Sequence, residues 1–125
     1  MSIPEELQYT TEHLWLRRTE DGSYFAGITD YAQDLLGDIV YVEAPAVGTA
    51  IKAGSACGLV ESVKTGSDLH APLDGIVEAV NEELSATPEK INDQPYQSWI
   101  FRLRPSDPAQ VGNLLSAAKY REFLG

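Results

Sequence analysis

Alternating apolar and polar positions predict a β-hairpin near the start of the chain. The segment 7–28 alternates around Trp15 and Phe25, and its centre is the polar stretch Glu-Asp-Gly-Ser at positions 20–23. Alternation with a period of two is typical of half-buried strands, and the polar stretch has the composition of a turn. We therefore expect two antiparallel strands joined at 20–23.

A short helix is expected after this hairpin. Thr29 or Asp30 can cap its N-terminus, and Gly37 can end it. Two similar segments follow, Gly-Asp-Ile-Val at 37–40 and Asp-Gly-Ile-Val at 74–77, and they flank a central pair of apolar runs. Repeated β units of this kind favour a mainly β fold, either a small pseudo-symmetric β-sandwich or a flattened barrel with short helices.

The last third of the chain predicts one more strand and a helical end. Residues 87–91 have cap and proline chemistry for a single helical turn, and a strand is expected at 99–103. In the segment 106–124 the apolar residues follow the spacing of an amphipathic helix; they are Val111, Leu114, Leu115 and Ala118. Gly112 and Asn113 offer a point at which this helix divides in two. We expect its apolar stripe to cover an open face of the β core.

Length and charge restrict the kind of protein and partner. A chain of 125 residues favours a single domain spanning residues 1–125. Its formal charge of −10 disfavours nucleic acid and anionic membranes and favours partners with basic patches. No apolar run approaches the length of a membrane span and no leader is evident, so we expect a cytoplasmic protein. The alternative of an organelle import segment that was removed earlier stays open. The single Cys57 cannot form an internal disulfide and is expected at a buried or half-buried position of a strand, where a small residue fits.

The usual catalytic motifs are missing from the sequence. His13 and His70 are the only histidines, and neither has metal-ligand spacing to another His, Cys or carboxylate, so both are interpreted as ordinary strand residues and no metal is expected. There is no nucleophile elbow, dinucleotide fingerprint or phosphate-binding loop. We therefore expect no catalytic residue and no self-sufficient enzyme.

Lys64 is the residue that the apolar pattern places at an exposed position between two predicted strands. The apolar runs on either side of it predict a hairpin at about 58–72, with Thr65-Gly66-Ser67 as turn residues and Lys64 in water at the tip. An exposed amine is a poor nucleophile unaided, so its chemistry would come from another enzyme that attaches a group to it. On hairpin geometry alone, a solubilising surface lysine is the stronger interpretation.

A longer ordered set of residues resembles the H protein family of the glycine cleavage system. The set begins with residues 27–33 and 36–38, continues through Glu61-Ser62-Val63-Lys64 and Ser67-Asp68, and ends at Trp99; it also includes Ala71-Pro72, Gly75, Val80-Asn81, Ile91-Asn92 and Pro95-Tyr96. The resemblance implies a lipoyl-domain-like carrier, not a catalyst, with lipoate in amide linkage on Lys64. It also assigns Glu61, Ser62, Val63 and Asp68 to the surroundings of the lipoylation site.

The resemblance further implies a set of partners. They are a pyridoxal-phosphate glycine decarboxylase (P protein), a folate-dependent aminomethyltransferase (T protein), dihydrolipoamide dehydrogenase (L protein) and a lipoylating enzyme. The carrier would shuttle the aminomethyl group of glycine between the first two and be reoxidised by the third. A monomer is expected from the charge and the resemblance.

Two positions depart from the family pattern. Family members commonly read His-Glu-Trp where this chain has His13-Leu14-Trp15, and the glutamate faces the amine of the loaded arm. Leu35 stands where the family's arm cleft commonly has a polar residue. Side-chain direction repeats every two residues along a strand, so Glu12 is expected on the same side as Leu14, where it can compensate.

Three other interpretations stay open. The departures at Leu14 and Leu35 motivate an H-like lipoyl donor or relay for other lipoate-dependent enzymes. A biotin carrier uses a similar hairpin, but the methionines usual beside its lysine are Val63 and Thr65 here. The third is a structural β domain with an incidental exposed lysine.

Overall fold

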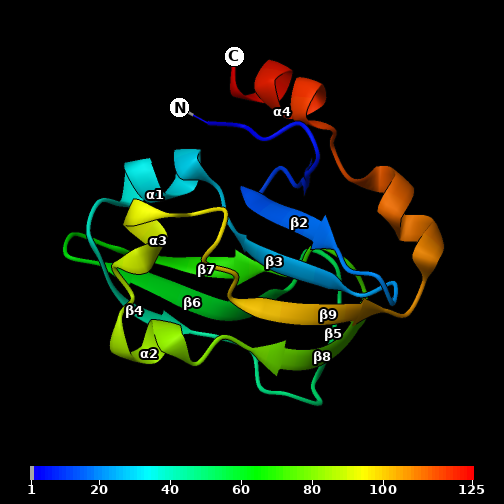
Figure 1. The fold of residues 1–125 in the computed structure, drawn as a ribbon, viewed down its shortest axis with the longest axis horizontal. Helices are drawn as coiled ribbons and strands as arrows, with labels where there is room; N and C mark the ends of the chain where they lie inside the picture. The colour runs from blue at the N-terminus through cyan, green and yellow to red at the C-terminus, as the bar shows by residue number, and fades with distance from the viewer. Residues whose placement is uncertain (1) are drawn as a thin grey trace.

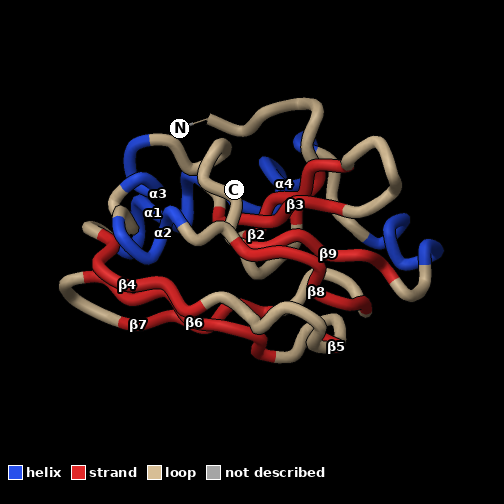
Figure 2. The backbone as a smooth tube through the Cα atoms, turned by 60° about the horizontal axis from the view of Figure 1, so that its bottom comes forward, coloured by secondary structure: helices blue, strands red, loops and turns tan. Residues whose placement is uncertain are grey.

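Two antiparallel β-sheets stacked face to face form the body of the molecule, as Figure 2 shows. The computed structural model describes residues 2–125. The strands are β1 (Gln8–Tyr9), β2 (Leu14–Arg18), β3 (Tyr24–Ile28), β4 (Ile39–Glu43), β5 (Ala50–Ile51), β6 (Ala56–Ser62), β7 (Gly66–His70), β8 (Gly75–Val80) and β9 (Phe101–Pro105). The helices are α1 (Asp30–Leu36), α2 (Glu83–Ala86), α3 (Lys90–Asp93), the 3-10 helix η1 (Pro108–Asn113) and α4 (Ala117–Leu124). Figure 1 shows their arrangement.

The predicted β-sandwich is confirmed, and the alternative of a flattened barrel is wrong. One sheet has the order β1-β2-β3-β9-β8-β5 and the other the order β4-β6-β7, and within residues 2–125 no strand ladder joins them. The two similar sequence segments lead into different sheets, because 37–40 enters β4 and 74–77 enters β8. The two similar segments therefore each lead into a strand, but the two strands lie in separate sheets and do not close a barrel.

The N-terminal hairpin forms as the alternation predicts, but both of its faces are covered. β2 pairs with β3 from Leu14 opposite Ile28 to Arg18 opposite Tyr24. Leu14 faces the space between the sheets and Trp15 faces outward, yet both are almost fully buried. The outward face is buried because the C-terminal helix lies over it.

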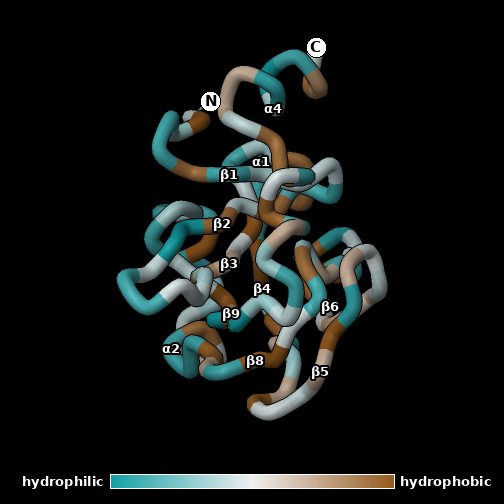
Figure 3. Tube along the Cα trace, turned by 90° about the vertical axis from the view of Figure 1, so that its right-hand side faces the viewer, coloured by the Kyte–Doolittle hydropathy of each residue, from teal (hydrophilic) through white to brown (hydrophobic). Residues whose placement is uncertain are grey.

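Two apolar clusters hold the fold together. The larger fills the space between the two sheets and includes residues of β2, β3, β6, β7, β8 and β9. The smaller lies outside the six-stranded sheet and consists of Leu7, Tyr9, Trp15, Ala117 and Tyr120. Figure 3 shows α4 and the N-terminal segment together at one end of the molecule, with β1 beneath them. Leu115 joins this arrangement through a two-way backbone bridge to Tyr9, with N···O distances of 2.7 and 2.8 Å.

The C-terminal segment divides in two at Gly112 and Asn113, as the sequence allowed, and its first part is a 3-10 helix. η1 ends at Asn113, the chain is extended at Leu114, and α4 begins after the Ser116 cap. Ala118 is exposed, whereas Ala117 and Tyr120 are the buried residues of α4. Elsewhere β9 begins two residues later than expected. The one-turn helix α2 was not predicted from the sequence pattern. Among residues 2–125 no helix is long and apolar enough to cross a membrane.

Candidate functional site

The turn between β6 and β7 places Lys64 at its tip. β6 ends at Ser62, β7 begins at Gly66, and the residues between them are exposed. Ser62 organises this turn: its hydroxyl oxygen accepts the backbone N–H of Lys64 at 3.3 Å and of Thr65 at 3.1 Å, and its O–H donates to the Thr65 carbonyl at 3.1 Å. The Ser62 N–H donates to the same carbonyl at 2.7 Å. The backbone at Lys64 is thus fixed while its side chain extends away.

The end of α1 lies beside this turn. Gly37 ends α1 with a φ of 83°, a conformation that side chains rarely adopt, and a Cβ added there would stand 3.4 Å from Cε of Lys64. The Val63 N–H donates to the Asp38 carbonyl at 3.0 Å, which ties the turn to the segment after α1. Glycine at position 37 is therefore required by the positive φ that ends the helix, and the Lys64 stem lies within contact distance of it.

Asn92 of α3 supports this junction, a role that the sequence reasoning missed. Its side-chain N–H groups donate to the Gly37 carbonyl at 2.8 Å and to Gln33 Oε1 at 2.9 Å, and its Oδ1 accepts the Ile39 N–H at 2.9 Å. One amide thereby joins α1, its C-terminal cap and β4. The available signal was the Ile91-Asn92 pair in the family resemblance, which carries no structural role by itself.

A cleft of about 120 Å³ lies beside the Lys64 turn. Its walls are α1, the segment from Glu12 to Leu14, and strands β6 and β7. The lining residues are Glu12, His13, Leu14, Ile28, Ala32, Leu35, Leu36, Val60, Ser67, Asp68 and Leu69. The floor is apolar, and the lining contains two carboxylates but no lysine or arginine. The cleft therefore suits a group with an apolar body and a cationic end.

The structure brings Glu12 and Leu14 to the same cleft for a different reason from the one expected. β2 begins only at Leu14, so the alternation of a strand does not extend to Glu12. Glu12 lies in a turn before the strand and is exposed, whereas Leu14 is 1% exposed in the cleft floor. Leu35 is 56% exposed at the α1 wall. The strand argument was wrong, although a carboxylate does lie over this part of the cleft.

The other predicted site residues surround Lys64 unequally. Val63 is 68% exposed beside Lys64, and Glu61 is exposed on β6 opposite Gly66. Asp68 is exposed on β7 opposite Leu59 and also lines the cleft. Ser62 is nearly buried, and its hydroxyl is occupied by the turn. Val63, Glu61 and Asp68 are therefore accessible to another protein, whereas Ser62 acts through the shape of the turn.

His13 is not an ordinary strand residue, so that interpretation was wrong. It has a φ of 67° in the turn before β2, and its Nδ1 lies 2.8 Å from the hydroxyl of Tyr120. Burial lowers the pKa of His13, with a smaller opposing effect from Glu12. His70 is in β7 as expected, with Nδ1 at 3.6 Å from a carboxylate oxygen of Glu12. Among residues 2–125 no cluster of three or more His, Cys, Asp or Glu could hold a metal ion.

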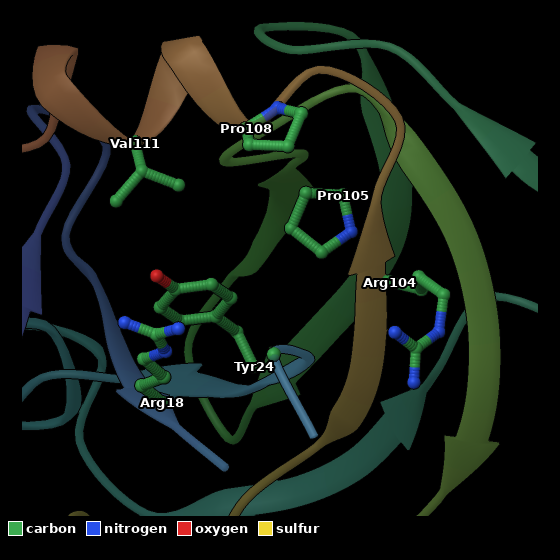
Figure 4. A pocket seen from close by; sticks show the side chains of 7 residues that line it. Arg18, Tyr24, Arg104, Pro105, Pro108 and Val111 are labelled. Atoms are coloured by element: carbon green, nitrogen blue, oxygen red, sulfur yellow. The ribbon is translucent and has the colours of Figure 1, made fainter. Parts of the chain in front are cut away.

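A larger pocket of about 440 Å³ lies near the β2–β3 turn and η1 (Figure 4), which Figure 1 shows at the other end of the molecule from the β6–β7 turn. Arg18, Tyr24 and Arg104 line it together with two prolines and Val111. The guanidinium of Arg104 is paired with Asp21 at 3.0 Å and Glu78 at 2.7 Å. Its charge is thus neutralised within the protein, and the pocket is far along the sheet from Lys64, so the smaller cleft is the better candidate site.

Cys57 does not contribute a reactive thiol. It lies half-buried in β6, and burial raises the pKa of its thiol to about 11. Thiolate is the reactive form, so Cys57 is inert at neutral pH. Cys57 is therefore not a candidate for attachment of a group, whereas the Lys64 side chain is exposed.

Comparisons with known proteins place this site in a family context. The family model described as Glycine cleavage H-protein matches residues 7–125, which include the turn, the cleft and α4. The chain belongs to the glycine cleavage H-protein family. A glycine cleavage system H protein from Methylobacillus flagellatus is 68% identical over 125 residues, covering all of both chains. One from Cronobacter sakazakii is 50% identical, covering 98% of this chain and 96% of its own.

The fold agrees with that of a solved member of the glycine cleavage H-protein family. A crystal structure from Mycobacterium marinum matches with a TM-score of 0.87 and 40% sequence identity. The match covers 96% of this chain and 97% of the other. Membership of the H-protein family, expected from the ordered residues around Lys64, is confirmed over nearly the whole chain.

Proposed function

We propose that this chain is the lipoyl carrier of the glycine cleavage system, with lipoate in amide linkage on Lys64. It is a carrier of a multienzyme system and not a catalyst. The observation that supports this function best is the exposed Lys64 on a fixed turn next to an apolar cleft with carboxylates in its lining. The proposal treats residues 1–125 as a single carrier domain, with the lipoyl hairpin at about 58–72 and the C-terminal helical segment at about 106–124.

The residues at the site fit lipoate. The Lys64 side chain extends from a backbone that Ser62 holds, so an attaching enzyme can reach the amine without unfolding the hairpin. The apolar floor of the cleft can accept an aliphatic arm, and the acidic lining can accept a cationic end. When bound, lipoate supplies a disulfide that accepts the aminomethyl group of glycine and a dithiol that is then reoxidised.

The chain's own residues position and protect the attached group. Acylation removes the positive charge of Lys64, and the fixed turn makes the arm a tether that raises its effective concentration at a docked active site. Glu12 and Asp68 hold a cationic end by charge from two different walls of the cleft. Leu14, Val60 and Leu69 exclude water from beneath it.

We also propose the partners of this carrier. They are the glycine decarboxylase, the aminomethyltransferase and dihydrolipoamide dehydrogenase of the system, together with a lipoylating enzyme that contacts Glu61, Val63 and Asp68 near the lysine. The formal charge of −10 favours partners with basic docking patches, so the affinity of each complex should fall as salt rises. The carrier itself acts as a monomer.

Glycine-dependent exchange of bicarbonate tests this function. The lipoylated protein is mixed with a competent glycine decarboxylase, and incorporation of labelled bicarbonate into glycine is measured. We expect exchange with the native chain and none with Lys64→Arg, because a guanidinium is not an acylable amine. Lys52→Arg, an exposed lysine away from the turn, is the matched control and should keep full exchange. Absence of exchange with the native lipoylated chain would contradict the proposal.

The same assay separates the relay alternative. A lipoyl donor for other enzymes would transfer lipoate but would not support exchange. Leu14 and Leu35 motivated that alternative, but Glu12 and Asp68 lie in the cleft lining, and the relatives above are H proteins of the glycine cleavage system. These observations favour the glycine cleavage role.

A further inference from the structure

One buried hydroxyl joins the two walls of the cleft. The Oη atom of Tyr120 in α4 lies 2.8 Å from Nδ1 of His13 and 2.8 Å from Oγ1 of Thr29. His13 belongs to the turn that forms one wall, and Thr29 is the N-cap of α1, which forms the other. The C-terminal helix therefore contacts both walls from behind through a single atom.

The wall that contains His13 needs such a support. Its φ of 67° is unfavourable for a residue with a Cβ, so surrounding contacts must hold it. The His13 N–H donates to the Thr10 carbonyl at 3.1 Å, and the His13 carbonyl accepts the Thr29 N–H at 3.0 Å. The neighbours of His13 on either side, Glu12 and Leu14, are cleft residues. A change in the backbone dihedral angles of His13 would therefore move the Glu12 carboxylate and the Leu14 side chain together.

The wall formed by α1 is fixed by the same group. Thr29 is fully buried, and its Oγ1 accepts the Ala32 N–H at 3.3 Å, which caps the helix. One arrangement satisfies every group: Thr29 donates its hydroxyl proton to Tyr120, and Tyr120 donates to neutral His13. Ala32, Leu35 and Leu36 of this capped helix line the cleft.

Tyr120 is itself held rigidly. Its side chain is fully buried and stacks on Tyr9 with ring centroids 4.7 Å apart and planes at 6°. Burial raises the pKa of Tyr120 to about 12, so the phenol keeps its proton. Tyr31 of α1 and Phe123 of α4 pack on the His13 ring at centroid distances of 4.8 and 6.0 Å. The Tyr120 hydroxyl is thus rigidly held, and its hydrogen bonds to His13 and Thr29 restrain the positions of both walls.

We propose that Tyr120 is a positioning residue that sets the separation of the cleft walls and thereby the retention of a cationic group in the cleft. It does not line the cleft, so it acts through His13 and Thr29. This inference rests on the proposed carrier function. It assigns to the C-terminal helix a role in cargo protection in addition to covering the sheet.

Tyr120→Phe tests the proposal, with Tyr9→Phe as the matched control. Both variants keep the stacked ring pair and remove one phenol hydroxyl. That of Tyr9 donates to the Pro4 carbonyl at 2.6 Å, and Tyr9 is not among the residues that line the cleft. The first measurement uses the full chain without lipoate, and follows amide hydrogen exchange at His13, Leu14 and Thr29. We expect exchange about three- to fivefold faster in Tyr120→Phe, the effect of one lost hydrogen bond, and unchanged in Tyr9→Phe.

The second measurement uses the lipoylated chain loaded from glycine by the decarboxylase. We expect spontaneous loss of the cargo, followed by intact mass, to be faster by a similar factor in Tyr120→Phe only. Equal amide exchange in the two variants, or equal loss of cargo from them, would overturn the inference. Failure of the carrier function is distinguishable, because the native chain would then accept no cargo while the exchange difference in the unlipoylated protein remained.

Discussion

The backbone N–H of Lys64 donates to Oγ of Ser62 at 3.3 Å, so the proposed modification site is held by the side chain two residues before it. The same oxygen accepts the Thr65 N–H, and the Ser62 O–H donates to the Thr65 carbonyl. A three-residue tip is thereby closed by one hydroxyl. The attached arm would pivot at the Lys64 side chain and not at a mobile loop.

Replacing Ser62 by alanine should loosen this tip. The change removes one acceptor for two backbone N–H groups, and we expect a loss of about 1 kcal/mol in the free energy of unfolding. The rate of lipoylation at limiting enzyme should fall, because the amine is no longer presented on a fixed turn. Denaturant unfolding and intact mass over time measure the two effects. Thr65→Ala on the same tip is the control, and equal rates in the two variants would show that the hydroxyl of Ser62 is not needed.

Removing the Asn92 side chain should destabilise the junction between α1 and β4. Asn92→Ala leaves three partly buried backbone or amide groups without their partner, so we expect a loss of about 2 kcal/mol in the free energy of unfolding. Asp93→Ala, an exposed neighbour on α3, should change stability by less than about 0.5 kcal/mol. Urea unfolding of both variants checks this expectation. A similar small effect at both positions would remove Asn92 from the support of the site.

Neutralising the cleft carboxylates should weaken retention of a cationic group. Glu12→Gln and Asp68→Asn keep shape and remove charge, and we expect each to speed loss of the cargo from the loaded carrier by about threefold, as for an exposed charge pair. Added salt should reduce the difference from the native chain. Glu20→Gln, on the β2–β3 turn, is the charge control. If all three variants lose cargo equally fast, general charge and not the cleft is responsible.

His13 should make stability depend on pH below neutrality. Burial lowers its pKa in the folded chain, so the unfolded chain binds the proton more readily. The stability that neutral His13 provides is complete above about pH 6.5 and is lost as pH falls toward the lowered folded pKa. Glu12 opposes the shift, and the other groups that face the ring are the aromatic side chains of Tyr31, Tyr120 and Phe123.

Thermal unfolding from pH 7 to pH 5 measures this dependence. His13→Asn removes the titration, and asparagine tolerates a positive φ, so the variant should lose less stability than the native chain over this range. His70→Gln is measured alongside it as the variant at the other histidine. The same slope in His13→Asn and the native chain would contradict the assignment.

The sequence predicted the parts of this structure that local patterns determine. Alternation located β2 and β3, Thr29 and Gly37 located the ends of α1, and the turn residues located the tip that carries Lys64. These features depend on hydrogen bonds and burial within a few residues. Family resemblance was required to separate Lys64 from any other exposed lysine, because nothing in a single hairpin marks its lysine as modified.

Contacts between distant segments were not predictable in this way. His13 has a left-handed backbone conformation, and its side chain is held by Tyr120, more than a hundred residues later. The strand therefore begins only after His13, and extending its periodicity back to Glu12 was incorrect. Asn92 supports α1 from another helix, and only the fold shows it. The division of the C-terminal helix at Gly112 and Asn113 was visible in the sequence, but the apolar spacing also placed Leu114 and Leu115 in a helix. Leu114 is extended, and Leu115 pairs with Tyr9 instead.

The mass of the intact protein from its native source, with fragmentation to locate the modified residue, tests the central claim most directly. The chain contains four lysines, at positions 52, 64, 90 and 119. We predict the increment of one lipoyl amide, located on Lys64. An increment on another lysine, a biotin increment, or an unmodified Lys64 in cells that carry out glycine cleavage would contradict the account.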